Sequence, residues 1–198
     1  MVGKKKKKQK SSRAKQGGIT VRQGRAAPHG SLENDLVHVF VDDQNLFWGI
    51  INDAQGPNFR VDFGRLLLAA AKGSDGRTRA VGSAYIAGVI PDDDSFWKVA
   101  ENRGFRVRRG YLGANNRSKQ DDAYLITDMT RTLFKESGPS TIVLVAGDAD
   151  YVPPLKAALE ENWRTEVAFI DRGVSVALEA CTHEIRTISP LEIEHLIT

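Results

Sequence analysis

Three groups of aspartate residues stand beside apolar segments of the chain. Asp42 directly follows one apolar run, and Asp148 and Asp150 follow another. Asp121 and Asp122 begin a segment of helical periodicity. Carboxylate oxygens are the ligands that Mg²⁺ and Mn²⁺ prefer, and a bound divalent cation removes the repulsion between neighbouring carboxylates. If the three groups meet in the folded chain, they predict a metal site that activates water and stabilises charge on a phosphate group.

The composition gives little support to other metals or to covalent cross-links. The chain has one cysteine, Cys181, so we expect no intrachain disulfide and no cysteine-rich zinc site. The histidines are scattered, without the short spacings of a zinc site, at His29, His38, His183 and His195. A single cysteine is also typical of a protein in a reducing compartment, which predicts a cytoplasmic location.

Short apolar runs alternate with segments of helical periodicity along most of the chain. Strands are predicted at 36–41, 80–90, 105–111, 141–146, 166–170 and 186–188, and helices at 61–72, 92–104, 121–136 and 151–162 and after residue 190. Such alternation favours parallel strands joined by right-handed crossovers, and continuously apolar strands favour a sheet covered on both faces. We therefore expect an α/β fold, a three-layer Rossmann-like sandwich with a mostly parallel sheet of about five or six strands.

The expected fold would gather the acidic groups at one edge of the sheet. In open α/β sheets, ligands bind beyond the carboxyl ends of the strands. Asp42 and Asp148 lie at this edge and meet if their strands are neighbours, and the helix that begins at Asp121 starts near the same edge. The acidic run 92–94 is interpreted differently, as favourable charge in the first turn of a helix.

The N-terminal segment differs in composition from the rest. Residues 1–25 contain seven Lys, three Arg and no acidic residue, whereas the remainder is net acidic. We predict a disordered basic tail over residues 1–34 and a folded domain over residues 35–198. The unbroken basic run Lys4, Lys5, Lys6, Lys7 and Lys8 would attract phosphate backbones, although a purely solubilising role is the alternative. Because the chain has no run of about eighteen apolar residues, no membrane-spanning helix is expected.

Three motifs resemble those of NYN domains, which are PIN-like ribonucleases. Segment 40–46 resembles their Asp-x-x-Asn-Leu motif, segment 119–128 their Lys-x-x-Asp-x-x-Leu-x-x-Asp motif, and segment 147–153 their Gly-Asp-Ser-Asp-Phe-x-Pro motif. The order and spacing agree over about residues 36–189. Ala146 and Ala149 stand where the family often has Ser, and His183 where it often has Asp, but every core carboxylate is kept.

The resemblance implies roles for individual residues. Asp42, Asp122 and Asp148 would bind Mg²⁺ or Mn²⁺ and act in catalysis, with Asp150 beside them and Asn45 orienting a water or an acidic side chain. Lys119 would contact a phosphate, or alternatively be a solvated loop lysine. Helix geometry leaves two further positions open. Asp128 lies about 120° around the helix from Asp122, and Asp121 shares the face of Asp128 more closely, so either residue is a candidate ligand.

The expected activity is that of a metal-dependent RNA endonuclease, which hydrolyses phosphodiester bonds in single-stranded RNA. Trp48 would stack on a base or belong to the core. One alternative is a catalytically weak RNA-binding or adaptor protein with the same fold. Another is a phosphatase of the haloacid dehalogenase kind, but such enzymes need a second acid where this chain has Gln44. Self-association is left open.

Overall fold

The structure is a computed structural model that describes residues 15–16, 19–26, 36–52, 59–89, 95–112, 118–170 and 173–195. The strands are β1 (Lys15–Gln16), β2 (Ile19–Gln23), β3 (Leu36–Asp42), β4 (Ala80–Val89), β5 (Arg106–Leu112), β6 (Ser118–Lys119), β7 (Thr141–Val145), β8 (Arg164–Phe169) and β9 (Glu184–Thr187). The helices are α1 (Asp43–Asn52), α2 (Phe63–Ala71), α3 (Ser95–Asn102), α4 (Asp121–Lys135), α5 (Val152–Glu160), α6 (Val176–Glu179) and α7 (Pro190–Ile193), with a 3₁₀ turn, η1 (Ala149–Tyr151).

The strands form one mostly parallel sheet in the order β1-β2-β9-β8-β7-β3-β4-β5-β6. The six strands from β9 to β5 are parallel to one another, which confirms the α/β expectation. Among the described residues the sheet has more strands than the expected five or six. The additional strands are antiparallel and lie at its two edges, with β1 and β2 beside β9 and β6 beside β5.

Strand β2 comes from the segment expected to be a disordered tail. It pairs antiparallel with β9, with Thr20 opposite Thr187 and Gln23 opposite Glu184. The backbone N–H of Gly24 then donates to the carbonyl oxygen of His183 at 2.9 Å. In this respect the structure differs from the expectation for residues 1–34, because 19–26 are part of the folded domain. The lysine run Lys4–Lys8 lies outside the described residues.

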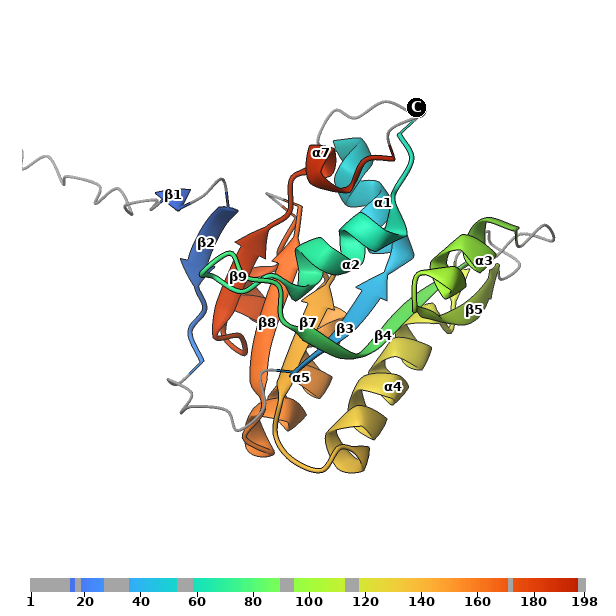
Figure 1. The fold of residues 1–198 in the computed structure, drawn as a ribbon. Helices are drawn as coiled ribbons and strands as arrows, with labels where there is room; N and C mark the ends of the chain where they lie inside the picture. The colour runs from blue at the N-terminus through green and yellow to red at the C-terminus, as the bar shows by residue number, and fades with distance from the viewer. Residues whose placement is uncertain are drawn as a thin grey trace, which may run out of the picture.

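Helices cover both faces of the sheet (Figure 1). The chain moves from β3 to β4 to β5 in one direction, and from β7 to β8 to β9 in the other. Right-handed crossovers therefore place α1, α2 and α3 on one face and α4 and α5 on the opposite face. The central strands β3 and β7 are buried along almost their whole length. None of the helices in the described ranges is long and apolar enough to span a membrane.

Helix α1 was not anticipated from the sequence. It starts at Asp43, immediately after β3, and its buried residues Leu46 and Ile50 lie one helical turn apart and face the sheet. The predicted helix over 92–104 is present as α3, but the acidic run 92–94 lies outside the described residues. The other predicted strands and helices agree with the structure to within a few residues at each end.

Candidate active site

The two halves of the sheet meet where β3 lies beside β7. These strands are parallel neighbours, with Val41 opposite Val145, and the crossovers leave them in opposite directions. Such a point, at the carboxyl ends of the strands, is where open α/β sheets bind ligands. Asn45 joins the two strand ends, because its side-chain Oδ1 accepts a hydrogen bond from the backbone N–H of Gly147 at 2.8 Å.

Asp42 ends β3 and is almost completely buried, with 4% of its surface exposed. Its Oδ1 accepts the backbone N–H of Asn45 at 2.9 Å, and its Oδ2 accepts the hydroxyl of Tyr151 at 2.9 Å. Burial raises the pKa of Asp42 to about 7, with smaller contributions from the charges of Asp122 and Asp121, although both hydrogen bonds oppose the shift. The group therefore resists ionisation at neutral pH.

Asp122 reaches the same place from the start of α4. Its Oδ1 lies 3.3 Å from the Tyr151 hydroxyl, which has one hydrogen and lies between the two carboxyl groups. Burial, followed by the charge of Asp121, raises the pKa of Asp122, while hydrogen bonds with Tyr151 and Asp42 lower it. Burial also raises the pKa of the Tyr151 hydroxyl, so this group stays protonated and donates. Asp42 and Asp122 are thus close enough to share a proton.

A sharp turn positions the start of α4. Gln120 has a φ of 74°, in the left-handed region that residues other than glycine rarely adopt. The turn makes Asp121 the first residue of the helix, with its side chain buried at 3% exposure. Lys119 lies just before the turn, in β6, where it pairs with Tyr111. Both Asp121 and Asp122 therefore lie at the site, and the structure leaves both as candidate ligands.

Asp43 is a residue that the sequence reasoning did not select. It begins α1, and burial, followed by the charges of Asp42 and Asp121, raises its pKa to about 7. Gly88 of β4 leaves room for it, since a Cβ at this position would lie 2.9 Å from the Cβ of Asp43. The spacing of Leu46 and Ile50 was the signal that would have predicted α1 and placed Asp43 at the sheet edge.

Asp148 and Asp150 follow β7 and are both exposed. The Oδ1 of Asp148 accepts the backbone N–H of Asp150 at 3.2 Å and so caps η1. Asp148 and Asn45 line a shallow cleft of about 380 Å³, together with residues 173–175. The charge of Asp150 makes a small contribution to the raised pKa of Asp122 at the start of α4. The third acidic group thus lies at the expected edge, with Asp148 on the cleft side.

Asp128 has a different environment. It is buried in α4, and its carboxylate is held by Arg108 of β5 through two hydrogen bonds, from Nε at 2.5 Å and from Nη2 at 3.0 Å. This ion pair occupies both oxygens of Asp128 and attaches α4 to the sheet. Trp48, in contrast, is 58% exposed on α1, so it is not a core residue.

The atoms at the site that could bind a metal ion are carboxylate oxygens and one phenolic oxygen. Such a set suits Mg²⁺ or Mn²⁺ rather than zinc or copper, which favour nitrogen and sulfur ligands. As the side chains stand in the described part of the chain, no three His, Cys, Asp or Glu groups are arranged to hold one ion together.

A family model provides the decisive comparison. The model of the NYN domain matches residues 36–189, most of the chain. The chain belongs to the NYN domain family. This family is generally ribonuclease-like and PIN-like, which agrees with the α/β sheet and with the acidic residues at its carboxyl edge.

The solved structures include a similar fold. A protein of unknown function from Vibrio parahaemolyticus has 18% sequence identity to this NYN domain and a TM-score of 0.65. The match covers 84% of this chain and 99% of the other. At this level of identity the likeness concerns the fold alone. No curated protein matches the chain significantly.

Proposed function

We propose that this NYN domain is a metal-dependent ribonuclease, which hydrolyses phosphodiester bonds in single-stranded RNA. Asp42, Asp122 and Asp148 would hold Mg²⁺ or Mn²⁺. The observation that carries the proposal is the proximity of Asp42 and Asp122, which come from different elements and contact one hydroxyl group at the junction of the two half-sheets. Structural carboxylates are normally paired with cations, whereas these two are paired with each other.

A divalent cation fits the electrostatics of this cluster. Burial raises the pKa of Asp42 and of Asp43 to about 7, so each carboxyl group keeps a proton at moderately acidic pH. A cation would replace these protons and relieve the repulsion between the carboxylates. When bound, it would supply an activated water and stabilise charge on the phosphate.

The surrounding residues would position the substrate and the acidic groups. Asn45 ties the end of β3 to Gly147 after β7 and thereby fixes the distance between the two strand ends. Lys119 directly precedes the turn into α4 and would contact a phosphate. The lysine run Lys4–Lys8 would add affinity for RNA that does not depend on sequence.

Cleavage of single-stranded RNA with Mn²⁺ or Mg²⁺ tests the proposal. Asp42→Asn and Asp148→Asn should each reduce the cleavage rate by more than about 100-fold, since each removes a ligand of the cation. Asp75→Asn is a matched control, because Asp75 is exposed and forms an ion pair with the nearby Arg77. The proposal is wrong if both site variants cleave RNA as fast as the unmodified protein.

The second candidate is an RNA-binding protein with little turnover. It is favoured by the basic segment 1–25, which contains seven Lys, three Arg and no acidic residue and would attract RNA without cleaving it. Deletion of residues 1–14, which precede β1, separates the two functions. A tail-driven binder would lose most of its RNA binding, whereas a nuclease would still cleave at high RNA concentration. The family match gives no support to the phosphatase alternative.

A further inference from the structure

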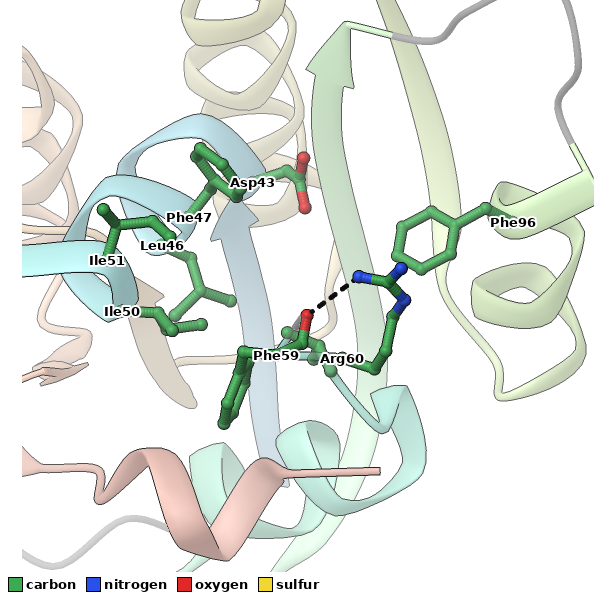
Figure 2. A pocket seen from close by; sticks show the side chains of 9 residues that line it. Asp43, Leu46, Phe47, Ile50, Ile51, Phe59, Arg60 and Phe96 are labelled. Carbon is green, nitrogen blue, oxygen red and sulfur yellow. Dashed lines mark hydrogen bonds between the residues drawn. The ribbon is translucent and has the colours of Figure 1, made fainter. Parts of the chain in front are cut away.

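An apolar cavity of about 330 Å³ lies beside the acidic cluster. It is bounded by α1, by the segment 59–61 before α2, and by the start of α3 (Figure 2). Leu46 and Ile50 form its floor, and both are buried against the sheet. Figure 2 shows Phe96 facing them from the opposite side. The volume is at the lower end of the range for small-molecule sites, about 300–1,000 Å³.

Two aromatic rings at this cavity are exposed to solvent. Phe47 is 53% exposed and Phe96 is 43% exposed. Phe47 packs edge-to-face with Trp48, with ring centroids 5.4 Å apart. Phe96 packs in the same way with Phe63 at 5.1 Å and with Trp97 at 5.6 Å, and these contacts hold the two rings in place. Exposed, supported rings in a cavity provide the flat apolar surfaces on which bases of single-stranded nucleic acids stack.

Two charged side chains complete the lining. The carboxyl group of Asp43 stands at one end of the otherwise apolar wall, and the exposed guanidinium of Arg60 lies near Phe96 (Figure 2). Asp43 immediately follows Asp42, so the cavity adjoins the candidate active site. A carboxylate accepts hydrogen bonds from amino groups at base edges, and a guanidinium binds phosphate oxygens. The lining therefore offers aromatic rings to the face of a base, a carboxyl group to its edge and a guanidinium group to a phosphate.

We propose that this cavity binds one base of the RNA strand and prefers bases with an exocyclic amino group to uracil. The proposal rests on the proposed ribonuclease function. It names the class of base that the RNA strand places in the cavity beside the candidate active site. Phe47 and Phe96 stack on the base, Asp43 accepts a hydrogen bond from its amino group, and Arg60 contacts the phosphate. Uracil presents a carbonyl oxygen at the corresponding edge and therefore has no amino hydrogen there to donate to Asp43.

Binding of short oligocytidine and oligouridine, measured by fluorescence anisotropy with a chelator present, tests the pocket without cleavage. Phe47→Leu and Phe96→Leu should each weaken binding of oligocytidine about tenfold, the effect of losing one stacked base. Phe134→Leu is a matched control, because Phe134 is 68% exposed on α4, on the other face of the sheet. Asp43→Asn should reduce the ratio of the two affinities, which a loss of folded protein would leave unchanged.

The outcomes separate this proposal from the ribonuclease function. If the Phe47 and Phe96 variants bind as the Phe134 variant does, or if the wild-type protein does not favour oligocytidine, the pocket does not bind a base. Metal-dependent cleavage abolished by Asp42→Asn would then still support the ribonuclease. If Phe47→Leu changes only the self-association seen by sedimentation, the surface is an interface between copies of the chain, which also overturns the proposal.

Discussion

The phenolic hydroxyl of Tyr151 donates a hydrogen bond to Oδ2 of Asp42 at 2.9 Å. Tyr151 ends η1, which follows β7, and Asp42 ends β3, so the bond links the two half-sheets at their junction. The segment 147–153 resembles a family motif with Phe at this position, so the resemblance alone does not predict a hydroxyl group there. Its proton helps to keep the Asp42 carboxylate ionised.

Tyr151→Phe should weaken metal binding. Without the hydroxyl, the pKa values of Asp42 and Asp122 rise further, because the hydrogen bond lowers both. At about pH 7 we expect a loss of roughly tenfold in Mn²⁺ affinity, as for other groups that support metal ligands. Titration calorimetry at several pH values measures the effect. The Mn²⁺ affinity of the variant should reach its plateau at a higher pH than that of the wild type.

Tyr124→Phe is the matched control for this variant. Tyr124 is 40% exposed on α4, and its hydroxyl lies 3.3 Å from Gln120 Oε1. Its removal should leave Mn²⁺ affinity and its pH dependence unchanged. Equal effects of the two substitutions would argue against a specific role of Tyr151.

The metal-free protein should become less stable as the pH rises from about 4 to about 7. The pKa of Asp43 is about 7 in the folded protein, against 3.8 for an unperturbed Asp. Within this window the folded state keeps a proton that the unfolded state has released, so stability falls with increasing pH. In Asp43→Asn the decrease in melting temperature between about pH 5 and about pH 8 should be smaller. Equal decreases would show that Asp43 ionises normally.

Asp128→Asn should separate structural from metal-binding carboxylates. The substitution leaves Arg108 without its bidentate partner, which should cost about 1–3 kcal/mol of unfolding free energy. Mn²⁺ affinity should stay at the wild-type value, whereas Asp42→Asn should reduce it by at least about tenfold. Urea denaturation and calorimetry measure the two effects. A large loss of Mn²⁺ affinity in Asp128→Asn would show that Asp128 is a metal ligand.

Glu166→Gln should be strongly destabilising. Glu166 is 1% exposed and forms ion pairs with Arg79 at 2.7 Å, Arg164 at 2.7 Å and Arg186 at 3.0 Å. Removal of its charge deprives three arginines of the buried carboxylate that they share, at a cost of about 3–5 kcal/mol in urea denaturation. Asp75→Asn, at an exposed position, should leave the stability close to that of the unmodified protein.

The pKa of Glu166 gives this cluster a pH dependence opposite to that of Asp43. Burial by itself would raise the pKa of Glu166. The surrounding arginines outweigh this effect and lower the pKa to about 2. Its contribution to stability is therefore complete above about pH 4.5 and disappears as the pH falls towards 2. Loss of stability between these values should be weaker in Glu166→Gln.

The acidic edge was predictable from the sequence because strand ends can be recognised locally. Apolar runs before Asp42 and Asp148 fixed where the strands end, and parallel topology brings such ends to one edge. The partner of Asp128 was not predictable, because Arg108 lies on a strand whose distance from α4 depends on the whole fold. Helical spacing alone could not distinguish a buried ion pair from a metal ligand.

The roles of Asp43 and Tyr151 were missed for related reasons. Asp43 was not selected from the sequence, since the helix that turns it towards Gly88 was not predicted. Tyr151 was matched to a family Phe, and the hydroxyl that distinguishes it has meaning only when Asp42 and Asp122 are nearby. Both errors come from contacts between segments far apart in the chain.

Strand β2 has a practical consequence for shortening the protein. It covers the backbone of β9, whose residues Glu184–Thr187 would otherwise present unpaired N–H and C=O groups. An uncovered edge of this kind recruits strands from other molecules and promotes aggregation. A truncation at residue 26 would therefore remove more than positive charge, because it would also expose the backbone of β9 to strands of other molecules.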